Sequence, residues 1–248
     1  MIAFTGLTLC TGRRKDAEEI LLTFSRYIRH GIVPNMFPDD NAAPLYNTAD
    51  ASLWYFYAVW QYLQYYPDTA ANAFVQENIY PHLKEIISAY KNGTDFSIHM
   101  EEDGLIHAGS GLDQITWMDV RVGDWVATPR HGKPVEINAL WYNALKVMEE
   151  FARRYEEDDD IPISGSHVMT SCDYAALAEL VRESFRQKFW WEEKGCLYDV
   201  VDGDEPDDHL RPNQIYAVSL PFTMLSKEQE GRIVTFANEE LKIGCGLR

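Results

Sequence analysis

Hydrophobic residues recur along this chain at the spacing of helices. Between Lys15 and Arg29 they return every three or four positions, which predicts one apolar face of an amphipathic helix. Asp50–Tyr66 is apolar on nearly every side, which predicts a helix buried in the interior. Because the alternating pattern of strands is nearly absent, we predict an all-α fold. Further helices are predicted over Thr69–Tyr90, Glu136–Tyr155, Ser171–Lys188, Pro212–Met224 and Ser226–Leu241.

Three of the predicted helices share one pattern. Those that open at Asp50, Glu136 and Pro212 have a polar start and an apolar, aromatic body, and an amphipathic helix lies between them each time. Alternating inner and outer helices predict a barrel of helical hairpins whose loops gather at one end over a central cavity. A plain helical bundle explains the apolar helices equally well, but bundles connect their helices with short loops.

Two long loops interrupt the predicted helices. Val33–Ala49 contains three prolines, which break both helices and interior strands. Asp103–Pro134 is rich in Gly and carries Trp and Asp without sustained periodicity. Loops of this length inside a compact domain are often functional, so they are the first places to look for chemistry.

The composition is that of a folded, acidic protein. Its 248 residues are 46% hydrophobic and 13% aromatic, and the formal net charge is −17, which argues against disorder. That charge repels nucleic-acid phosphates and anionic membrane surfaces, so a neutral or cationic ligand is favoured. No targeting or membrane-spanning segment is visible. Four cysteines without a C-x-x-C pair predict a reduced, cytoplasmic protein.

The loop Asp103–Pro134 combines the side chains that a sugar pocket uses. Trp117 and Trp125 offer apolar faces to the C–H faces of sugar rings, and neighbouring Asp and Arg side chains offer acceptors and donors to hydroxyl groups. Hydrolysis of a glycosidic bond needs one carboxylic acid that protonates the leaving oxygen and a second carboxylate. Asp119, in T-W-M-D, is the candidate acid, although a loop Asp more often has a turn or capping role.

Long motifs in a fixed order connect the chain to a known family. They are G-L-T-L-C-T-G-R from Gly6, V-P-N-M-F-P-D from Val33, Y-N-T-A-D-A-S-L-W from Tyr46, I-T-W-M-D-V-R-V-G-D-W-V-A-T-P-R-H-G-K-P-V-E-I-N-A-L-W-Y-N-A-L from Ile115, and R-P-N-Q-I-Y-A-V-S-L-P from Arg211. Over essentially its whole length the chain resembles the amylo-α-1,6-glucosidase domain of glycogen debranching enzymes. The resemblance implies an (α/α)6 barrel and hydrolysis of the α-1,6-linked glucose at glycogen branch points, with inversion.

The resemblance also implies roles for matching residues. Asp119 is expected to be the general acid that donates a proton to the leaving glucan oxygen. The implied partner is an α-glucan such as glycogen or branched maltodextrin. The residues expected to line the glucose pocket or its rim are Trp117, Asp124, Trp125, Arg130, Glu136, Asp50, Trp54, Arg211 and Asn213.

The chain departs from the family pattern at both ends. Family domains begin earlier, with a W-G-R-D-type motif, and continue beyond the G-C-G-L-R at Gly244 into the region expected to carry the second catalytic carboxylate. We therefore expect one partial (α/α)6 domain over residues 1–248, truncated at both ends, with fewer helices than a closed barrel. Such an open barrel would expose apolar edges that favour self-association. Without the second carboxylate, the isolated chain should show weak or no hydrolysis.

Two other functions fit parts of the sequence. A related helical-barrel hydrolase such as a glucoamylase or a trehalase would share the fold, and a non-catalytic or degenerate glucan-binding remnant would share the pocket. Neither a metal nor another cofactor is predicted. The seven His include no H-E-x-x-H, the acidic stretches Glu156–Asp160 and Asp199–Asp208 lack EF-hand spacing, and nucleotide-binding glycine motifs are missing.

Overall fold

The computed structural model describes residues 1–39, 42–155, 169–201 and 207–247, and most of the structure is helical, as the hydrophobic pattern predicted. None of the helices in these ranges has both the length and the apolar character needed to cross a membrane. The α-helices are α1 (Arg14–Arg26), α2 (Asp50–Tyr65), α3 (Thr69–Asn78), α4 (Tyr80–Asn92), α5 (Val135–Tyr155), α6 (Ser171–Phe189), α7 (Tyr216–Ser219) and α8 (Lys227–Phe236).

Short antiparallel strand pairs, which the sequence did not predict, join neighbouring loop segments. The pairs are β1 (His99–Met100) with β2 (Ile106–His107), β3 (Arg121–Val122) with β4 (Trp125–Val126), β5 (Lys133–Pro134) with β8 (Val200–Val201), β6 (Trp190–Trp191) with β7 (Cys196–Leu197), and β9 (Lys242–Ile243) with β10 (Gly246–Leu247). Turns of 3-10 helix lie at Asp95–Ser97 and Pro212–Ile215, and π-helical turns lie at Thr5–Leu9 and Ala237–Leu241.

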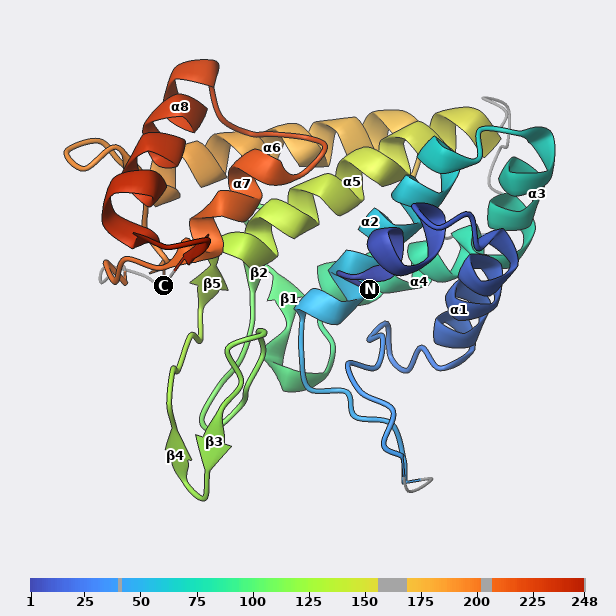
Figure 1. Ribbon diagram of the computed structural model, residues 1–248, viewed down its shortest axis with the longest axis horizontal. Coiled ribbons are helices and arrows are strands. Elements are labelled where there is room, and N and C mark those ends of the chain that lie inside the picture. The colour runs from blue at the N-terminus through green and yellow to red at the C-terminus, as the bar shows by residue number, and fades with distance from the viewer. Residues whose placement is uncertain (40–41, 156–168, 202–206, 248) are drawn as a thin grey trace.

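Helix α5 is the central helix of the molecule. Helices α2, α6 and α7 pack against it, and α6 runs alongside it as a second long helix (Figure 1). Most side chains of α5 are buried, and α2 buries large aromatic rings such as Tyr55, Phe56 and Tyr62. The prediction of an interior helix over Asp50–Tyr66 is therefore confirmed, because only burial removes that much apolar surface from water.

The prediction of one helix over Thr69–Tyr90 is wrong, because the segment forms α3 and α4. The two helices meet at Ile79, whose φ of −118° departs from helical geometry. Pro81 follows in the first turn of α4. A proline has no N–H to bond the carbonyl of a preceding turn, but it is accepted at the start of a new helix. The chain therefore ends one helix and begins another at this point.

The helix predicted over Pro212–Met224 is also shorter in the structure. The segment opens with a 3-10 turn, and α7 ends at Ser219. Pro221 explains the end, because a proline disfavours helical geometry in the residue before it, and Leu220 is extended with ψ 157°. In contrast, α8 and the π-helical turn after it account for nearly all of the predicted Ser226–Leu241 helix.

The N-terminal ends of α2, α5 and α7 lie on the side of the molecule from which the long loops project (Figure 1). A bond from the Ala49 amide to the Ile115 carbonyl (2.8 Å) joins the loop before α2 to the loop before α5. The β5–β8 pair joins the loop before α5 to the segment that leads to α7. The loops of these three helices thus meet at one end, as the repeated pattern predicted.

Ion pairs around the buried side chain of Lys133 hold the two ends of the loop Asp103–Pro134 together. Lys133, near the end of the loop, donates to Asp103 at its start (2.9 Å) and pairs with Glu101 (2.5 Å). Lys188 of α6 also donates to Asp103. Burial would raise the pKa of Asp103, but the hydrogen bonds from the two lysines outweigh it and lower that pKa. Both ends of the loop are therefore anchored to the helical body.

Candidate active site

A buried ion-pair network lies where the loop Asp103–Pro134 meets the first turn of α5. Arg130 donates to both carboxylate oxygens of Glu136, with Nη2 to Oε2 at 2.7 Å. It also donates to Asp199 from Nε (2.7 Å) and Nη2 (3.0 Å). The side chains of Arg130 and Glu136 are only 1% and 2% exposed. Burial would lower the pKa of Arg130, but the charges of Glu136 and Asp199 outweigh it and raise that pKa.

This geometry uses the whole guanidinium group of Arg130. Its N–H groups are directed at Glu136 and Asp199, and Nη1 also contacts the hydroxyl of Thr116 at 3.4 Å. A planar fork with five donors can hold two carboxylates in this way, which a lysine cannot do. Arg130 and Glu136, both predicted to line the glucose pocket, are therefore paired with each other inside the protein, at 3% and 2% exposure.

Asp199 is the centre of the network. Besides Arg130, it accepts hydrogen bonds from Arg211 Nη1 (2.5 Å) and Asn213 Nδ2 (2.8 Å). Arg211 continues the network to Asp207 at 2.8 Å. Burial would raise the pKa of Asp207, but the hydrogen bond from Arg211 outweighs it and lowers that pKa. Three predicted site residues thus converge on one carboxylate, and one of them, Arg130, is 69 positions away in the sequence.

Trp117 reaches the network through its indole nitrogen. Nε1 donates to Oδ1 of Asn213 at 3.0 Å. The Trp117 residue is 49% exposed, whereas Asn213 is completely buried. Trp117 therefore presents an aromatic ring to solvent while its N–H is fixed from below.

Helix α2 brings Asp50 and Trp54 close to the starts of α5 and α7. Trp54 packs edge-to-face against Tyr216 of α7, with ring centroids 5.3 Å apart. Burial raises the pKa of Asp50 to about 6, and the negative charge of Glu136 contributes to this shift. Burial and the charges of Glu136 and Asp50 likewise raise the pKa of Tyr216. A carboxyl group with a pKa near neutrality is typical of acid–base and binding sites.

The three remaining predicted residues are exposed. Asp119 lies between Trp117 and β3, and it makes no hydrogen bond or ion pair to any residue that the structure describes. Asp124 and Trp125 belong to the β3–β4 hairpin, which projects away from the helices (Figure 1). The Asp124 side chain is 97% exposed, and Trp125 is 61% exposed. The structure thus places these two residues on a projecting arm, apart from the Arg130 network.

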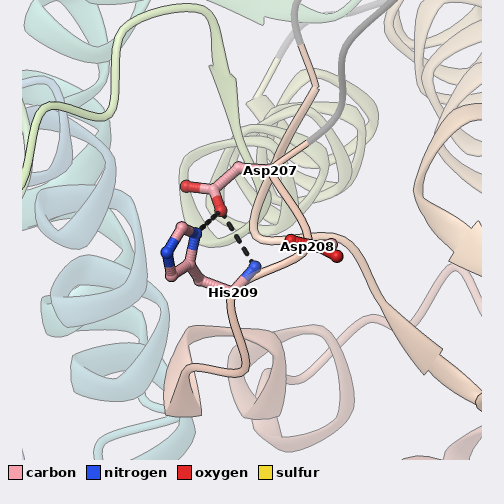
Figure 2. A group of neighbouring side chains, drawn as sticks. All are labelled: Asp207, Asp208 and His209. Carbon is pink, nitrogen blue, oxygen red and sulfur yellow. Dashed lines mark hydrogen bonds and ion pairs between the residues drawn. The ribbon is translucent and has the colours of Figure 1, made fainter.

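A small cluster next to Arg211 consists of three residues whose side chains can bind a metal ion: Asp207, Asp208 and His209 (Figure 2). Asp207 Oδ1 accepts from the backbone amide of His209 (2.9 Å) and lies 2.5 Å from its Nδ1. The other Asp207 oxygen is bonded to Arg211, whose positive charge disfavours a cation there. These contacts describe a turn that supports Arg211. Residues 156–160 and 202–206 of the predicted acidic stretches lie outside the described ranges.

Sequence reasoning gave no role to the central residue, Asp199. It treated Asp199 as one carboxylate of an acidic stretch, whereas the structure buries it to 2% exposure. The available signal was its position between apolar residues, after Leu197 and before Val200 and Val201. An acidic residue in a buried apolar segment needs a charged partner, and that need could have directed attention to the nearby arginines.

Known proteins with similar sequences give an independent view. The family model described as amylo-alpha-1,6-glucosidase matches residues 1–248. The glycogen debranching enzyme of Saccharomyces cerevisiae is 24% identical over 325 residues, an alignment that covers 100% of this chain and 20% of the yeast protein. The chain therefore spans about a fifth of the length of that relative.

Two solved rhamnosidases share the fold. A rhamnosidase from Klebsiella oxytoca with rhamnose bound superposes with a TM-score of 0.63 at 15% identity, over 92% of this chain and 38% of that one. The GH78 family rhamnosidase of Bacillus sp. GL1 gives 0.58 at 17% identity, over 91% of this chain and 22% of that one. At these identities the similarity concerns the fold alone.

Proposed function

The chain belongs to the amylo-α-1,6-glucosidase family, and from this membership we propose that it is a glycosidase acting on glycogen-like α-glucan. The proposed reaction is hydrolysis of the α-1,6-linked glucose at a branch point, with inversion at the anomeric carbon. Because the chain aligns with 20% of the yeast enzyme, the activity of that whole enzyme enters here as part of the proposal.

We propose Asp119 as the general acid of this reaction. Its protonated carboxyl group would give a proton to the leaving glucan oxygen while water attacks the anomeric carbon from the opposite face. Asp119 is exposed and free of protein hydrogen bonds within the described ranges, which suits a group that meets a polymer end arriving from solvent. Trp117, two residues earlier, would present its ring to a sugar face.

The observation that carries the proposal is the junction of the T-W-M-D segment with the inner helices. The network of Arg130, Asp199 and Asn213 joins Trp117 to the first turn of α5. We place the glucose at this junction, with Asp50 and Trp54 of α2 and Arg211 at its edge. A carboxyl group with a pKa of about 6, as in Asp50, can donate a hydrogen bond to a hydroxyl group near neutral pH when it is protonated, and accept one when it is ionised.

We also propose that the helices form part of an (α/α)6 barrel. In this arrangement α2, α5 and α7 are inner helices, with α6 and α8 outside them. The TM-score of 0.63 to a rhamnosidase supports a shared helical architecture. A cytoplasmic location is proposed as well, and the four cysteines, all free in the structure, are consistent with a reducing compartment.

We propose that hydrolysis by the isolated chain is weak. An inverting glycosidase needs a second carboxylate that activates water. Both oxygens of Glu136 accept from Arg130, and Asp199 is held by Arg130, Arg211 and Asn213. Asp124 lies on the projecting hairpin. None of these three carboxylates is placed as a free base beside Asp119.

The first test is glucose release from a maltodextrin that carries one α-1,6-linked glucose. We expect slow release by the wild-type chain and none above background for Asp119→Asn, because the amide cannot donate the proton. Glu102→Gln is the matched control, since Glu102 is an exposed carboxylate in the turn between β1 and β2. It should retain the wild-type rate.

Other substrates and outcomes separate the alternatives. Faster release from linear α-1,4 maltodextrin or from trehalose would contradict the debranching proposal and favour a glucoamylase-like or trehalase-like enzyme. Binding of the branched dextrin without any release would contradict hydrolysis and favour a glucan-binding remnant. Equal rates for wild type and Asp119→Asn would contradict the assignment of Asp119.

A further inference from the structure

We propose that Asp199 and Asn213 are positioning residues that fix the plane of the Trp117 ring for contact with the glucan chain. The part that concerns glucan rests on the proposed function. The inference gives Asn213 a different role from the pocket-rim contact that the sequence predicted, because its amide faces the protein and not the solvent.

The contacts form a directed chain of hydrogen bonds. Asp199 Oδ1 accepts from Nδ2 of Asn213 at 2.8 Å, and Oδ1 of Asn213 accepts from Nε1 of Trp117 at 3.0 Å. An indole N–H can only donate and a carboxylate can only accept. The Asn213 amide therefore has one orientation that satisfies both partners, since a flipped amide would oppose two donors at one end and two acceptors at the other.

Asp199 is itself immobilised. Arg130 binds it through two nitrogens, at 2.7 and 3.0 Å, and Arg211 binds it at 2.5 Å. The residues Asp199 and Asn213 are 2% and 0% exposed. Charged hydrogen bonds of this kind are stronger than neutral ones, and water cannot replace them inside the protein. The anchor beneath Trp117 is thus rigid on the scale of a side chain.

A fixed ring matters because stacking on a sugar requires a defined plane. A freely rotating aromatic side chain must lose rotamer entropy when it binds, and a ring held in place beforehand does not. Trp125 offers an internal comparison, because it is also exposed but its indole N–H has no partner in the described part of the chain. We infer that Trp117 is the ordered platform of the two.

The anchor itself is tested by hydrogen exchange of the indole N–H groups in the ¹⁵N-labelled full chain. Trp117→Phe and Trp125→Phe assign the two signals without altering a buried residue. We expect the Trp117 indole N–H to exchange about tenfold more slowly than that of Trp125. Equally fast exchange at the two positions would overturn the inference, whatever the protein binds.

The consequence for the ligand is tested by a double-mutant cycle. Binding of the singly branched maltodextrin is measured for wild type, Trp117→Phe, Asn213→Leu and the double variant, with thermal unfolding to verify folding. Each single substitution is expected to weaken binding about twofold to tenfold. The double variant should lose little more affinity than Asn213→Leu alone, because both substitutions remove the same hydrogen bond.

Trp125→Phe provides the matched second cycle. In the variant that combines Trp125→Phe with Asn213→Leu, the fold-losses of affinity should multiply. The two residues share no contact within the described ranges, so each substitution should act independently of the other. Independent, multiplying effects of Trp117→Phe and Asn213→Leu would overturn the positioning role. Absence of binding by the wild type would contradict the proposed function and the glucan role, while the exchange measurement would still decide whether the anchor exists.

Discussion

At the scale of single residues, Arg130 is a buried charge with a structural role, because it pairs with Glu136 and Asp199. Its donors are directed at Thr116, Glu136 and Asp199, so the side chain joins the loop before α5 to the first turn of α5 and to the segment that carries Asp199. Removing one partner from a buried ion pair leaves the other charge without compensation, which is far more costly than losing an exposed pair.

We expect Arg130→Met to destabilise the chain by about 3–5 kcal/mol, because the carboxylates of Glu136 and Asp199 stay buried without their counter-charge. Urea unfolding measures this as a fall in the midpoint. The control is Arg153→Met, whose side chain is 56% exposed, and it should cost about 0–1 kcal/mol. Similar losses for the two variants would contradict the structural role of Arg130.

Asp50 should make stability depend on pH. Its pKa is raised to about 6, so the folded state holds the proton more tightly than the unfolded state, where the pKa is about 3.9. The stability contributed by this protonation is complete below about pH 4 and is lost as the pH rises through about 6. At neutral pH the ionised, buried carboxylate costs on the order of 3 kcal/mol.

Asp50→Asn removes this titration, so its stability relative to wild type should improve by about 2 kcal/mol between about pH 4 and about pH 7, as measured by urea unfolding. The stability of Asp68→Asn relative to wild type should instead fall as the pH rises, because hydrogen bonds from Arg14 and the Ala71 amide lower the pKa of Asp68. Parallel pH profiles for wild type and Asp50→Asn would contradict the shift.

At the scale of elements, α5 binds strand β2 and the segment after α7 through two asparagines. Asn138 accepts from the Ile106 amide (2.7 Å) and donates to its carbonyl (3.1 Å). Asn143 does the same with Phe222, at 2.9 and 2.8 Å. Each side-chain amide thus satisfies a backbone unit as a neighbouring strand would, and one helix binds both segments.

Asn138→Leu and Asn143→Leu are each expected to destabilise the chain by about 1–3 kcal/mol, because a backbone unit loses its partners. Amide hydrogen exchange should accelerate at Ile106 in the first variant and at Phe222 in the second. Each variant serves as the control for the other. Loss of protection at both amides in either variant would show that the contacts are not local, contrary to this expectation.

At the scale of the whole molecule, two properties act against each other in association. The net charge of −17 makes copies of the protein repel one another, whereas exposed apolar residues near the two ends of the chain favour contact between copies. Ile2 and Leu7 near the start and Ile243 near the end are more than half exposed. At low ionic strength, charge repulsion between copies opposes association, and salt screens that repulsion. We propose that self-association through these apolar residues becomes possible when the charge is screened.

We expect the sedimentation coefficient to rise when the salt concentration is increased to about 1 M, where the screening length is about 3 Å. Leu7→Glu combined with Ile243→Glu should prevent the rise. Leu180→Glu, in α6, is the control and should not prevent the rise, although Leu180 is also exposed. A monomer at every salt concentration would contradict the proposed association.

The sequence by itself determined the helices with clear periodicity, the interior character of α2 and the family of the chain. These properties are local, because a helix pattern or a long motif lies within one stretch of sequence. Only the tertiary structure decided that Asp199 binds Arg130, 69 positions away, and that Trp117 is anchored by Asn213, 96 positions away. Which charges pair and which side chains are buried depends on where separate loops meet in space. The same Trp and Asp motif therefore contains a buried frame at Arg130 and an exposed arm at Trp125.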